Sequence, residues 1–284
     1  MPQKTLNFIF FGTPEVASKT LQILKSNGYI PLLIITSPDK PSGRGLEMHE
    51  TPSAIWAHEN NIKCLKPEKL TAEFIESLPD VDLNIVVAYG KIIPEILINK
   101  PKLGTINIHY SLLPKYRGAS PVEACLLNGD EETGVSIQQM EYKLDSGPII
   151  KEEKIDIGIN DNKKEIRETL INLGANLLCN ILPEIEQGQI VPQKQDENYA
   201  TFCKKIKKED GELDLNQSGK LNWNKYRAYE GWPGTFFFIN KGAKKIRIKI
   251  KWATFINNEF IIKRVIPEGK KEINYADYIK QNPL

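Results

Sequence analysis

Three polar residues have the types and the spacing to act together on a carbonyl group. Asn107 and His109 alternate with apolar residues in the run 105–109, and Asp145 follows in the sequence Leu-Asp-Ser-Gly. Residues two apart on a strand point to the same side, so the amide and the imidazole share a face. Such a pair can stabilise an oxyanion and move a proton, and a carboxylate can orient the imidazole and stabilise its cation.

Each of these signals also has a plain structural interpretation. A single histidine is more often structural, although only His109 among the three histidines stands at a predicted strand end beside an amide. Asp-Ser-Gly is by itself a turn signature. Gly-Thr-Pro at 12–14 is either a β–α turn or a loop that faces a polar ligand. It is not Gly-x-Gly-x-x-Gly, which disfavours a nicotinamide cofactor.

The elements that must position these residues are short apolar runs that alternate with helical patterns. The strand-like runs are 6–11, 30–36, 83–88, 105–109 and 134–140, with a helical stripe at 14–27. Apolar strands alternating with helices predict an α/β fold with a doubly wound, mostly parallel sheet covered on both faces. Such sheets bind ligands beyond the carboxyl ends of their strands. We therefore expect ligands at the loops 12–15, 37–51, 88–94 and 107–120.

Two domains are predicted. Residues 1–186 hold the parallel sheet and end in a long helix over 161–185, and the polar segment 187–200 is a linker by composition. Residues 201–284 change to an alternating pattern, which predicts a small, β-rich, barrel-like domain. Its strands are expected at 236–239, 245–252 and 259–265.

Composition excludes several classes of protein. The 284 residues are 40% hydrophobic and 26% charged, which is typical of a globular protein rather than a collagen-like or disordered one. No apolar run approaches the ~18 residues of a membrane span. The four cysteines form no Cys-x-x-Cys pair, which disfavours a zinc ribbon or a disulfide framework and favours the cytoplasm. We see no metal-ligand cluster and expect no metal.

Six stretches, in order along almost the whole chain, resemble the folate-dependent formyltransferases, and within them the branch that formylates methionyl-tRNA. They are Phe-Gly-Thr-Pro-Glu at 11–15, Pro-Ser-Gly-Arg-Gly at 41–45, Val-Ala-Tyr-Gly-Lys-Ile-Ile-Pro at 87–94, Asn-x-His-x-Ser-Leu-Leu-Pro-x-Tyr-Arg-Gly at 107–118, Leu-Asp-Ser-Gly at 144–147 and Tyr-Ala-x-x-x-x-Lys-Ile-x-Lys-Glu-Asp-Gly at 199–211. The fourth and fifth stretches are typical of the catalytic domain. The second and sixth favour the branch that acts on tRNA.

The resemblance implies a Rossmann-like catalytic domain over 1–186 and a tRNA-binding domain over 201–284. It implies that Asn107, His109 and Asp145 are catalytic. The formyl donor would be 10-formyltetrahydrofolate, bound near Ala88, Tyr89, Gly90 and Ile92 and near Ser111, Leu112, Leu113 and Pro114. The acceptor would be the α-amine of methionine on initiator tRNA, with Arg44 at the acceptor end of the tRNA. The product would serve translation initiation, and we expect a cytoplasmic monomer.

Charge is unevenly distributed along the chain. Residues 201–284 hold 18 Lys and Arg against 9 Asp and Glu, whereas the remaining residues hold 20 against 27. A basic tail suggests a polyanionic partner. Within it, alternation over 245–252 predicts Lys245, Arg247, Lys249 and Lys251 on one face and Ile246, Ile248, Ile250 and Trp252 on the core face. The cations, about 7 Å apart, suit tRNA phosphates, and the alternative is a solvated edge strand.

Other functions stay open at this point. The chain could formylate a small amine such as an amino sugar nucleotide, hydrolyse formyl-folate, or bind RNA without catalysis. Arg117 either binds a substrate phosphate or anchors its loop. The chain also departs from the family where Leu-Glu-Met-His-Glu stands at 46–50 and where Tyr110 replaces a small residue or proline.

Overall fold

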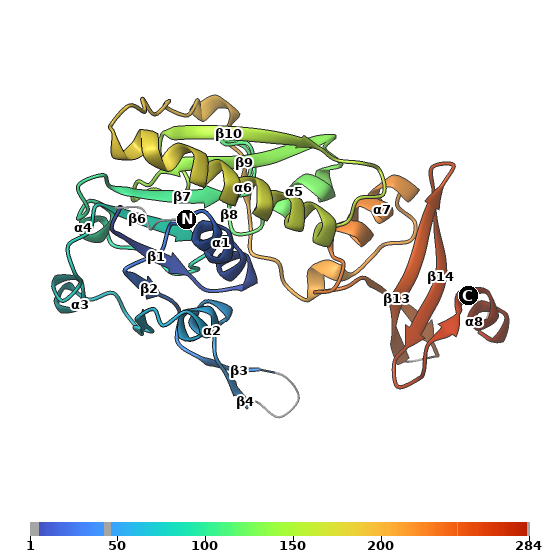
Figure 1. Cartoon of the computed structure of the whole chain (residues 1–284). Helices are drawn as coiled ribbons and strands as arrows, with labels where there is room; N and C mark the ends of the chain where they lie inside the picture. Colours follow the sequence, from blue (N-terminus) through green and yellow to red (C-terminus); the bar gives the residue numbers. More distant parts are fainter. Residues whose placement is uncertain (1–5, 43–46, 243, 283–284) are drawn as a thin grey trace. The chain divides into compact units, whose positions relative to one another are not determined.

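The computed structural model describes residues 6–42, 47–242 and 244–282, and Figure 1 shows their helices and strands, many of them labelled. Contacts divide the chain into two compact units. The first contains residues up to 118 together with 134–154 and 168–202, and the second contains 119–133, 155–167 and the residues from 203 onward. The predicted linker 187–200 thus lies within the first unit. The predicted domain boundaries themselves stay a prediction.

The first unit is built on a seven-stranded sheet in the order β10-β9-β7-β6-β1-β2-β5 (Figure 1). β5, β2, β1, β6 and β7 are parallel, and β9 runs antiparallel to β7. This confirms the predicted, mostly parallel sheet. The strands are β1 (Phe8–Gly12), β2 (Leu33–Ile35), β5 (Cys64–Leu65), β6 (Leu83–Val87), β7 (Thr105–His109), β9 (Glu132–Gln139) and β10 (Ile149–Asp156).

Helices cover both faces of this sheet because alternate strand residues point to opposite sides. Ile9 and Phe11 of β1 join a core cluster with residues of α3 (Ala72–Glu76) and α4 (Glu95–Ile98). Phe10 points the other way and is fully buried near α1 (Glu15–Ser26).

Glycines allow two of these helices to approach the sheet closely. A Cβ on Gly12 would lie 2.5 Å from Ala17 Cβ in α1, so the strand-to-helix turn admits only glycine. On α6 (Lys163–Glu186), a Cβ on Gly174 would lie 3.0 Å from side-chain atoms of both Ile108 and Val135, which places this helix against β7 and β9.

Shorter elements fill the loops at the carboxyl ends of the strands. β3 (Lys40–Ser42) and β4 (Glu47–His49) pair antiparallel within the predicted loop 37–51. The next helix, α2 (Pro52–Glu59), begins after Thr51, whose Oγ1 accepts the Ala54 N–H at 3.2 Å. The remaining short elements near the first unit are β8 (Arg117–Gly118), the 3₁₀ turn η1 (Glu197–Tyr199) and β11 (Phe202–Cys203).

The second unit contains a four-stranded antiparallel sheet in the order β12-β13-β14-β15. This confirms the predicted β-rich tail. Its strands are β12 (Phe236–Lys241), β13 (Lys244–Ile256), β14 (Glu259–Pro267) and β15 (Ile273–Asn274), and its helical elements are α5 (Pro121–Asn128), η2 (Glu209–Gly211), α7 (Gly219–Ala228) and α8 (Tyr275–Gln281). α5 packs against α7. Within the described parts of the chain, no helix is both long and apolar enough to cross a membrane.

The prediction that Trp252 lies on the core face of its strand is wrong. Ile248 and Ile250 are buried as predicted, but the side chain of Trp252 is 53% exposed. The pairing of β13 with β14 shifts register on both sides of Trp252. A bulge adds one residue to the alternation, so the next buried position falls on Ala253.

Candidate active site

Asn107 and His109 lie at the carboxyl end of β7, in the interior of the sheet. Asn107 is flanked by Val86 on β6 and by Gln138 on β9. Its side-chain amide makes no hydrogen bond to another described residue, although the residue is half-buried. His109 is buried, and its Nε2 lies 2.9 Å from the carbonyl oxygen of Tyr116. Because a carbonyl only accepts, Nε2 carries a proton there.

Asp145 approaches the same histidine from the loop after β9. Its Oδ2 lies 3.7 Å from His109 Nδ1 and accepts the backbone N–H of Gly118 at 2.8 Å. Its Oδ1 accepts Gln138 Nε2 at 3.0 Å. The residue adopts φ +48°, a left-handed conformation that non-glycine residues rarely hold without support.

These three residues therefore come together in the first unit, in an arrangement suited to stabilising charge. One ring nitrogen of His109 faces a carbonyl oxygen and the other faces a carboxylate, so both sides of the ring meet hydrogen-bond acceptors. The side chains of His109 and Asp145 are only 6% and 13% exposed, so their charges act through little water. Asn107 supplies an uncommitted N–H donor beside them.

Sequence reasoning left the role of Arg117 open, and the structure makes it an anchor. Arg117 is fully buried, so it presents no guanidinium face to solvent. Its Nε and an η-nitrogen donate to Gln195 Oε1 at 3.0 and 2.7 Å, and the same η-nitrogen donates to Glu197 at 2.8 Å. These bonds hold the pKa of Glu197 at about 2, with Lys143 as the second hydrogen-bonding cation.

Gln195 is the residue that sequence reasoning missed. It lies in the segment predicted to be a linker, is only 6% exposed, and donates Nε2 to the carbonyls of Asp145 and Gly147 at 2.9 and 2.7 Å. No motif marks it in the sequence, since a glutamine in a polar segment is an ordinary surface residue.

The loop after β6 holds the first group of predicted folate contacts. Ala88 and Gly90 are exposed and have positive φ values of 47° and 77°. The side chain of Ile92 is 80% exposed, an unusual exposure for an apolar residue. Tyr89 is instead buried, its hydroxyl has no hydrogen-bond partner among the described residues, and burial raises its pKa to about 12. Any ligand on this loop would meet backbone groups and the Ile92 side chain.

The second group of predicted folate contacts follows His109 directly. Ser111 is buried and donates to the carbonyl of Lys115 at 2.6 Å. Leu113 is also buried, and its N–H donates to Ser136 Oγ at 2.9 Å. Leu112 and Pro114 are half-buried. The loop is thus a fixed, largely apolar surface next to the catalytic candidates.

The predicted tRNA contacts are not part of this cluster. Arg44 lies outside the described residues. Lys245, Arg247, Lys249 and Lys251, which we call the basic face of β13, lie in the second unit. Two of these cations also stack on aromatic rings of β12: Lys245 Nζ lies 4.1 Å from the Phe238 ring centre, and the Arg247 guanidinium lies 3.7 Å from that of Phe236.

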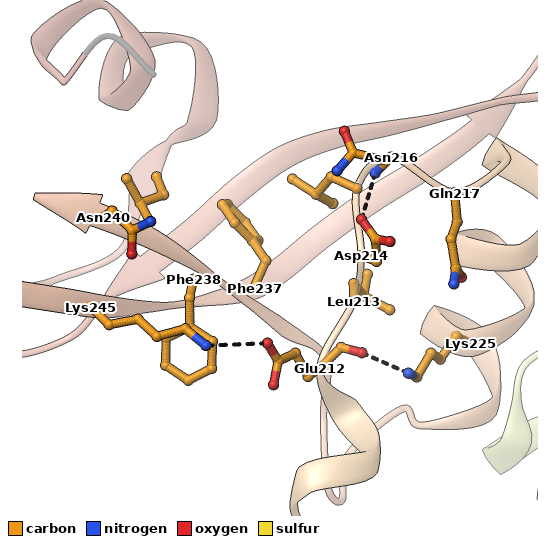
Figure 2. A pocket seen from close by; sticks show the side chains of 12 residues that line it. Glu212, Leu213, Asp214, Asn216, Gln217, Lys225, Phe237, Phe238, Asn240 and Lys245 are labelled. Carbon is orange, nitrogen blue, oxygen red and sulfur yellow. Dashed lines mark hydrogen bonds and ion pairs between the residues drawn. The ribbon is translucent and has the colours of Figure 1, made fainter.

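A groove of ≈620 Å³ in the second unit lies beside this face (Figure 2). Figure 2 shows that its two lysines turn toward one residue, Glu212. Lys245 pairs with the Glu212 carboxylate at 3.7 Å, and Lys225 donates to the Glu212 carbonyl at 2.6 Å. Because both lysines already have partners within the protein, we assign no ligand to the groove itself, although the Lys245 side chain stays 60% exposed on the basic face of β13.

Comparison with known proteins yields family matches over both parts of the chain. Residues 4–182 match the formyl transferase family, and residues 205–261 match the formyl transferase C-terminal domain. A methionyl-tRNA formyltransferase of Dictyoglomus thermophilum is 37% identical, with 96% of each chain covered.

Two solved structures share the fold at low sequence identity. A methionyl-tRNA formyltransferase from Clostridium thermocellum has a TM-score of 0.61 and 19% identity, over 95% of this chain and 100% of that one. An N-formyltransferase from Helicobacter canadensis, solved with folinic acid and dTDP-3-aminofucose, has a TM-score of 0.64 and 19% identity, over 95% of this chain and 99% of that one.

Proposed function

The chain belongs to the formyl transferase family, and we propose that it transfers the formyl group of 10-formyltetrahydrofolate to the α-amine of methionine on initiator methionyl-tRNA. The observation that carries this proposal is the 37% identity to a methionyl-tRNA formyltransferase over 96% of both chains. The match spans both the catalytic part and the basic tail of this chain.

The site in the first unit has the groups that such a reaction needs. The neutral amine attacks the formyl carbon, an N–C bond forms, and the carbonyl oxygen becomes an oxyanion. We assign the Asn107 amide as the hydrogen-bond donor to this oxyanion, because it makes no hydrogen bond to another described residue. A charged His109 stabilises the same negative charge electrostatically, and the Asp145 carboxylate, 3.7 Å away, stabilises the charged ring.

Collapse of the intermediate returns the electron pair to the carbonyl and breaks the bond between the formyl carbon and N10 of the folate. The amine nitrogen loses one proton and N10 gains one, so the reaction is balanced without a metal or an oxidant. We assign this proton transfer to His109 and Asp145, the two titratable groups that lie together at the strand ends.

The donor fits the two loops beside these residues. We place the folate along Ala88–Ile92 and Ser111–Pro114, where an aromatic ring system can lie on Ile92 and Leu112 while exposed backbone groups at Ala88 and Gly90 supply polar contacts. Tyr89 contributes backbone groups only, because its side chain is buried.

The tRNA requires a second, larger contact surface. We propose that the basic face of β13 contacts phosphates of the tRNA and that Arg44 acts at its acceptor end. Two cations that already stack on aromatic rings lose less side-chain freedom on binding phosphate than two free ones would.

We further expect the chain to act as a monomer in the cytoplasm.

The decisive experiment combines the purified chain with 10-formyltetrahydrofolate and methionyl-tRNA. Mass analysis of the amino acid released from the tRNA should show formylmethionine, formed at a rate that depends on the protein. Unformylated methionine after many expected turnovers would overturn the proposal.

A small amine is the competing acceptor, because the N-formyltransferase from Helicobacter canadensis, which has a similar fold, was solved with an amino sugar nucleotide. At 19% identity, the likeness to the Helicobacter canadensis protein shows a shared fold only. The relative that is 37% identical over 96% of both chains is instead a methionyl-tRNA formyltransferase, which favours tRNA as the acceptor. The same assay with dTDP-amino sugars separates the two acceptors, since formylation of the sugar without formylation of methionyl-tRNA would reverse the assignment.

A further inference from the structure

The segment 187–201 makes side-chain hydrogen bonds to both loops that hold the His109–Asp145 pair. We propose that Gln195 is a positioning residue for formyl transfer, which fixes the Asp145 loop relative to the loop that carries Tyr116 and Gly118. This inference rests on the proposed function, because it assigns a role within the same site.

The hydrogen bonds of Gln195 join the two loops directly. On one side, its Oε1 accepts two N–H groups of the buried Arg117 at 3.0 and 2.7 Å. On the other side, its Nε2 donates to the carbonyls of Asp145 and Gly147 at 2.9 and 2.7 Å. A glutamine amide uses both of its ends here, so no residue with only donors or only acceptors can replace it.

Both loops also need support, because each has a residue in a strained conformation. Asp145 has φ +48° and Tyr116 has φ +60°. Thr201 holds the second loop: its Oγ1 accepts the Tyr116 N–H and its carbonyl accepts the Arg117 N–H, each at 2.9 Å. The same short segment thus binds both strained loops.

These two loops set the distance between His109 and Asp145. Tyr116 accepts the hydrogen bond of His109 Nε2, and Gly118 donates to Asp145 Oδ2. If Gln195 no longer ties the loops, the carboxylate is free to move away from the ring. A displacement of ~1 Å at a reacting group costs on the order of 10²-fold in rate.

The variant Gln195→Glu separates the tie to the Asp145 loop from hydrogen bonding to Arg117. A glutamate retains the acceptor for Arg117 but has no donor for the carbonyls of Asp145 and Gly147. We expect kcat to fall by ~10- to 100-fold while KM for 10-formyltetrahydrofolate changes less than ~3-fold. Gln195→Met, of similar size but without either set of hydrogen bonds, should show the same split.

Glu197→Gln is the matched control. It weakens the contacts of Glu197 with Arg117 and with the exposed Lys143 but touches neither Asp145 nor Gly147, so kcat should stay within ~2-fold of the wild-type value. Thermal unfolding of each variant verifies that it is folded. A folded Gln195→Glu variant with wild-type kcat would overturn the proposal.

Hydrogen–deuterium exchange provides a readout that does not depend on the reaction. The Gly118 N–H is protected by Asp145, so its exchange should accelerate by ~10-fold or more in Gln195→Glu and stay unchanged in Glu197→Gln. Unchanged exchange at Gly118 in Gln195→Glu would refute the positioning role. An inactive wild-type protein in which this exchange responds as expected would instead refute only the proposed function.

Discussion

Replacing Asp145 by asparagine tests the charge at the centre of the proposed mechanism. The asparagine has the same shape, and its carbonyl can still accept the Gly118 N–H. Its NH₂ group would then face Gln138, whose Nε2 now donates to Asp145. Gln138 Oε1 is buried and has no partner among the described residues, so rotation of this amide provides an acceptor. The fold should therefore survive the change.

The size of the effect follows from the distance between the charges. At 3.7 Å and an effective dielectric constant of about 20, a carboxylate stabilises a charged imidazole by roughly 4 kcal/mol. The exposed fractions of 6% and 13% argue for only partial screening by water. If half to all of this energy is gained only as the ring becomes charged in the transition state, its loss in Asp145→Asn predicts a fall in kcat of ~30-fold to ~10³-fold.

Single-turnover quench-flow with methionyl-tRNA measures the chemical step, and fluorescence titration measures folate affinity separately. We expect the rate to fall within that range while the folate dissociation constant stays within about twofold. A rate within threefold of wild type, in a folded variant, would mean that the carboxylate does not stabilise the transition state. A parallel loss of folate affinity would mean instead that Asp145 shapes the folate site.

Three further expectations concern other parts of the chain. Asn107→Ala should lower kcat by ~10²-fold with folate affinity retained, and stopped-flow rates near wild type would remove Asn107 from the oxyanion site. The raised pKa of Tyr89, about 12, means that the unfolded chain loses this proton first, so stability falls as pH rises above ~10. In urea denaturation at pH ~11.5, the free energy of unfolding of Tyr89→Phe should have fallen by about 2 kcal/mol less than that of the wild type. Equal losses in both proteins would contradict the raised pKa of Tyr89. Changing the four cations of the basic face of β13 to glutamine should flatten the salt dependence of tRNA binding by about one unit of slope per phosphate contact, with folate affinity as the control.

The parallel sheet could be predicted because its signal is local. Largely apolar runs such as 8–12 and 83–87, the second interrupted only by Asn84, are buried on both faces, and the structure places them at the centre of the sheet. The edge strand β10 could not be predicted in this way. Its sequence, Ile-Ile-Lys-Glu-Glu-Lys-Ile-Asp, is largely exposed and contains a run of four charged residues that hides its periodicity.

The proximity of His109 and Asp145 could be expected because both residues follow or end strands of the same sheet. The hydrogen bonds of Gln195 that support this pair could not be predicted. Hydrogen bonds from Gln195 to residues 48 and 50 positions earlier in the chain depend on how a polar segment folds back. Hydrophobic periodicity carries no information about such a segment. Trp252 shows that alternation alone can also mislead. A single bulge, which the regular sequence pattern does not reveal, moved this residue to the exposed face of its strand.

The choice of acceptor must be made outside the reacting site. Methionyl-tRNA and an amino sugar nucleotide both present a primary amine, and an amide, an imidazole and a carboxylate act on any amine that reaches the formyl carbon. Affinity for tRNA then depends on phosphate contacts, which add free energy without reading the amine. We propose that the excess of cations in the tail, 18 against 9 acidic residues, supplies such contacts. A minimal acceptor such as a methionine ester should therefore react at a rate that is insensitive to the basic face of β13 and to salt. The rate with methionyl-tRNA at limiting concentration should depend strongly on both.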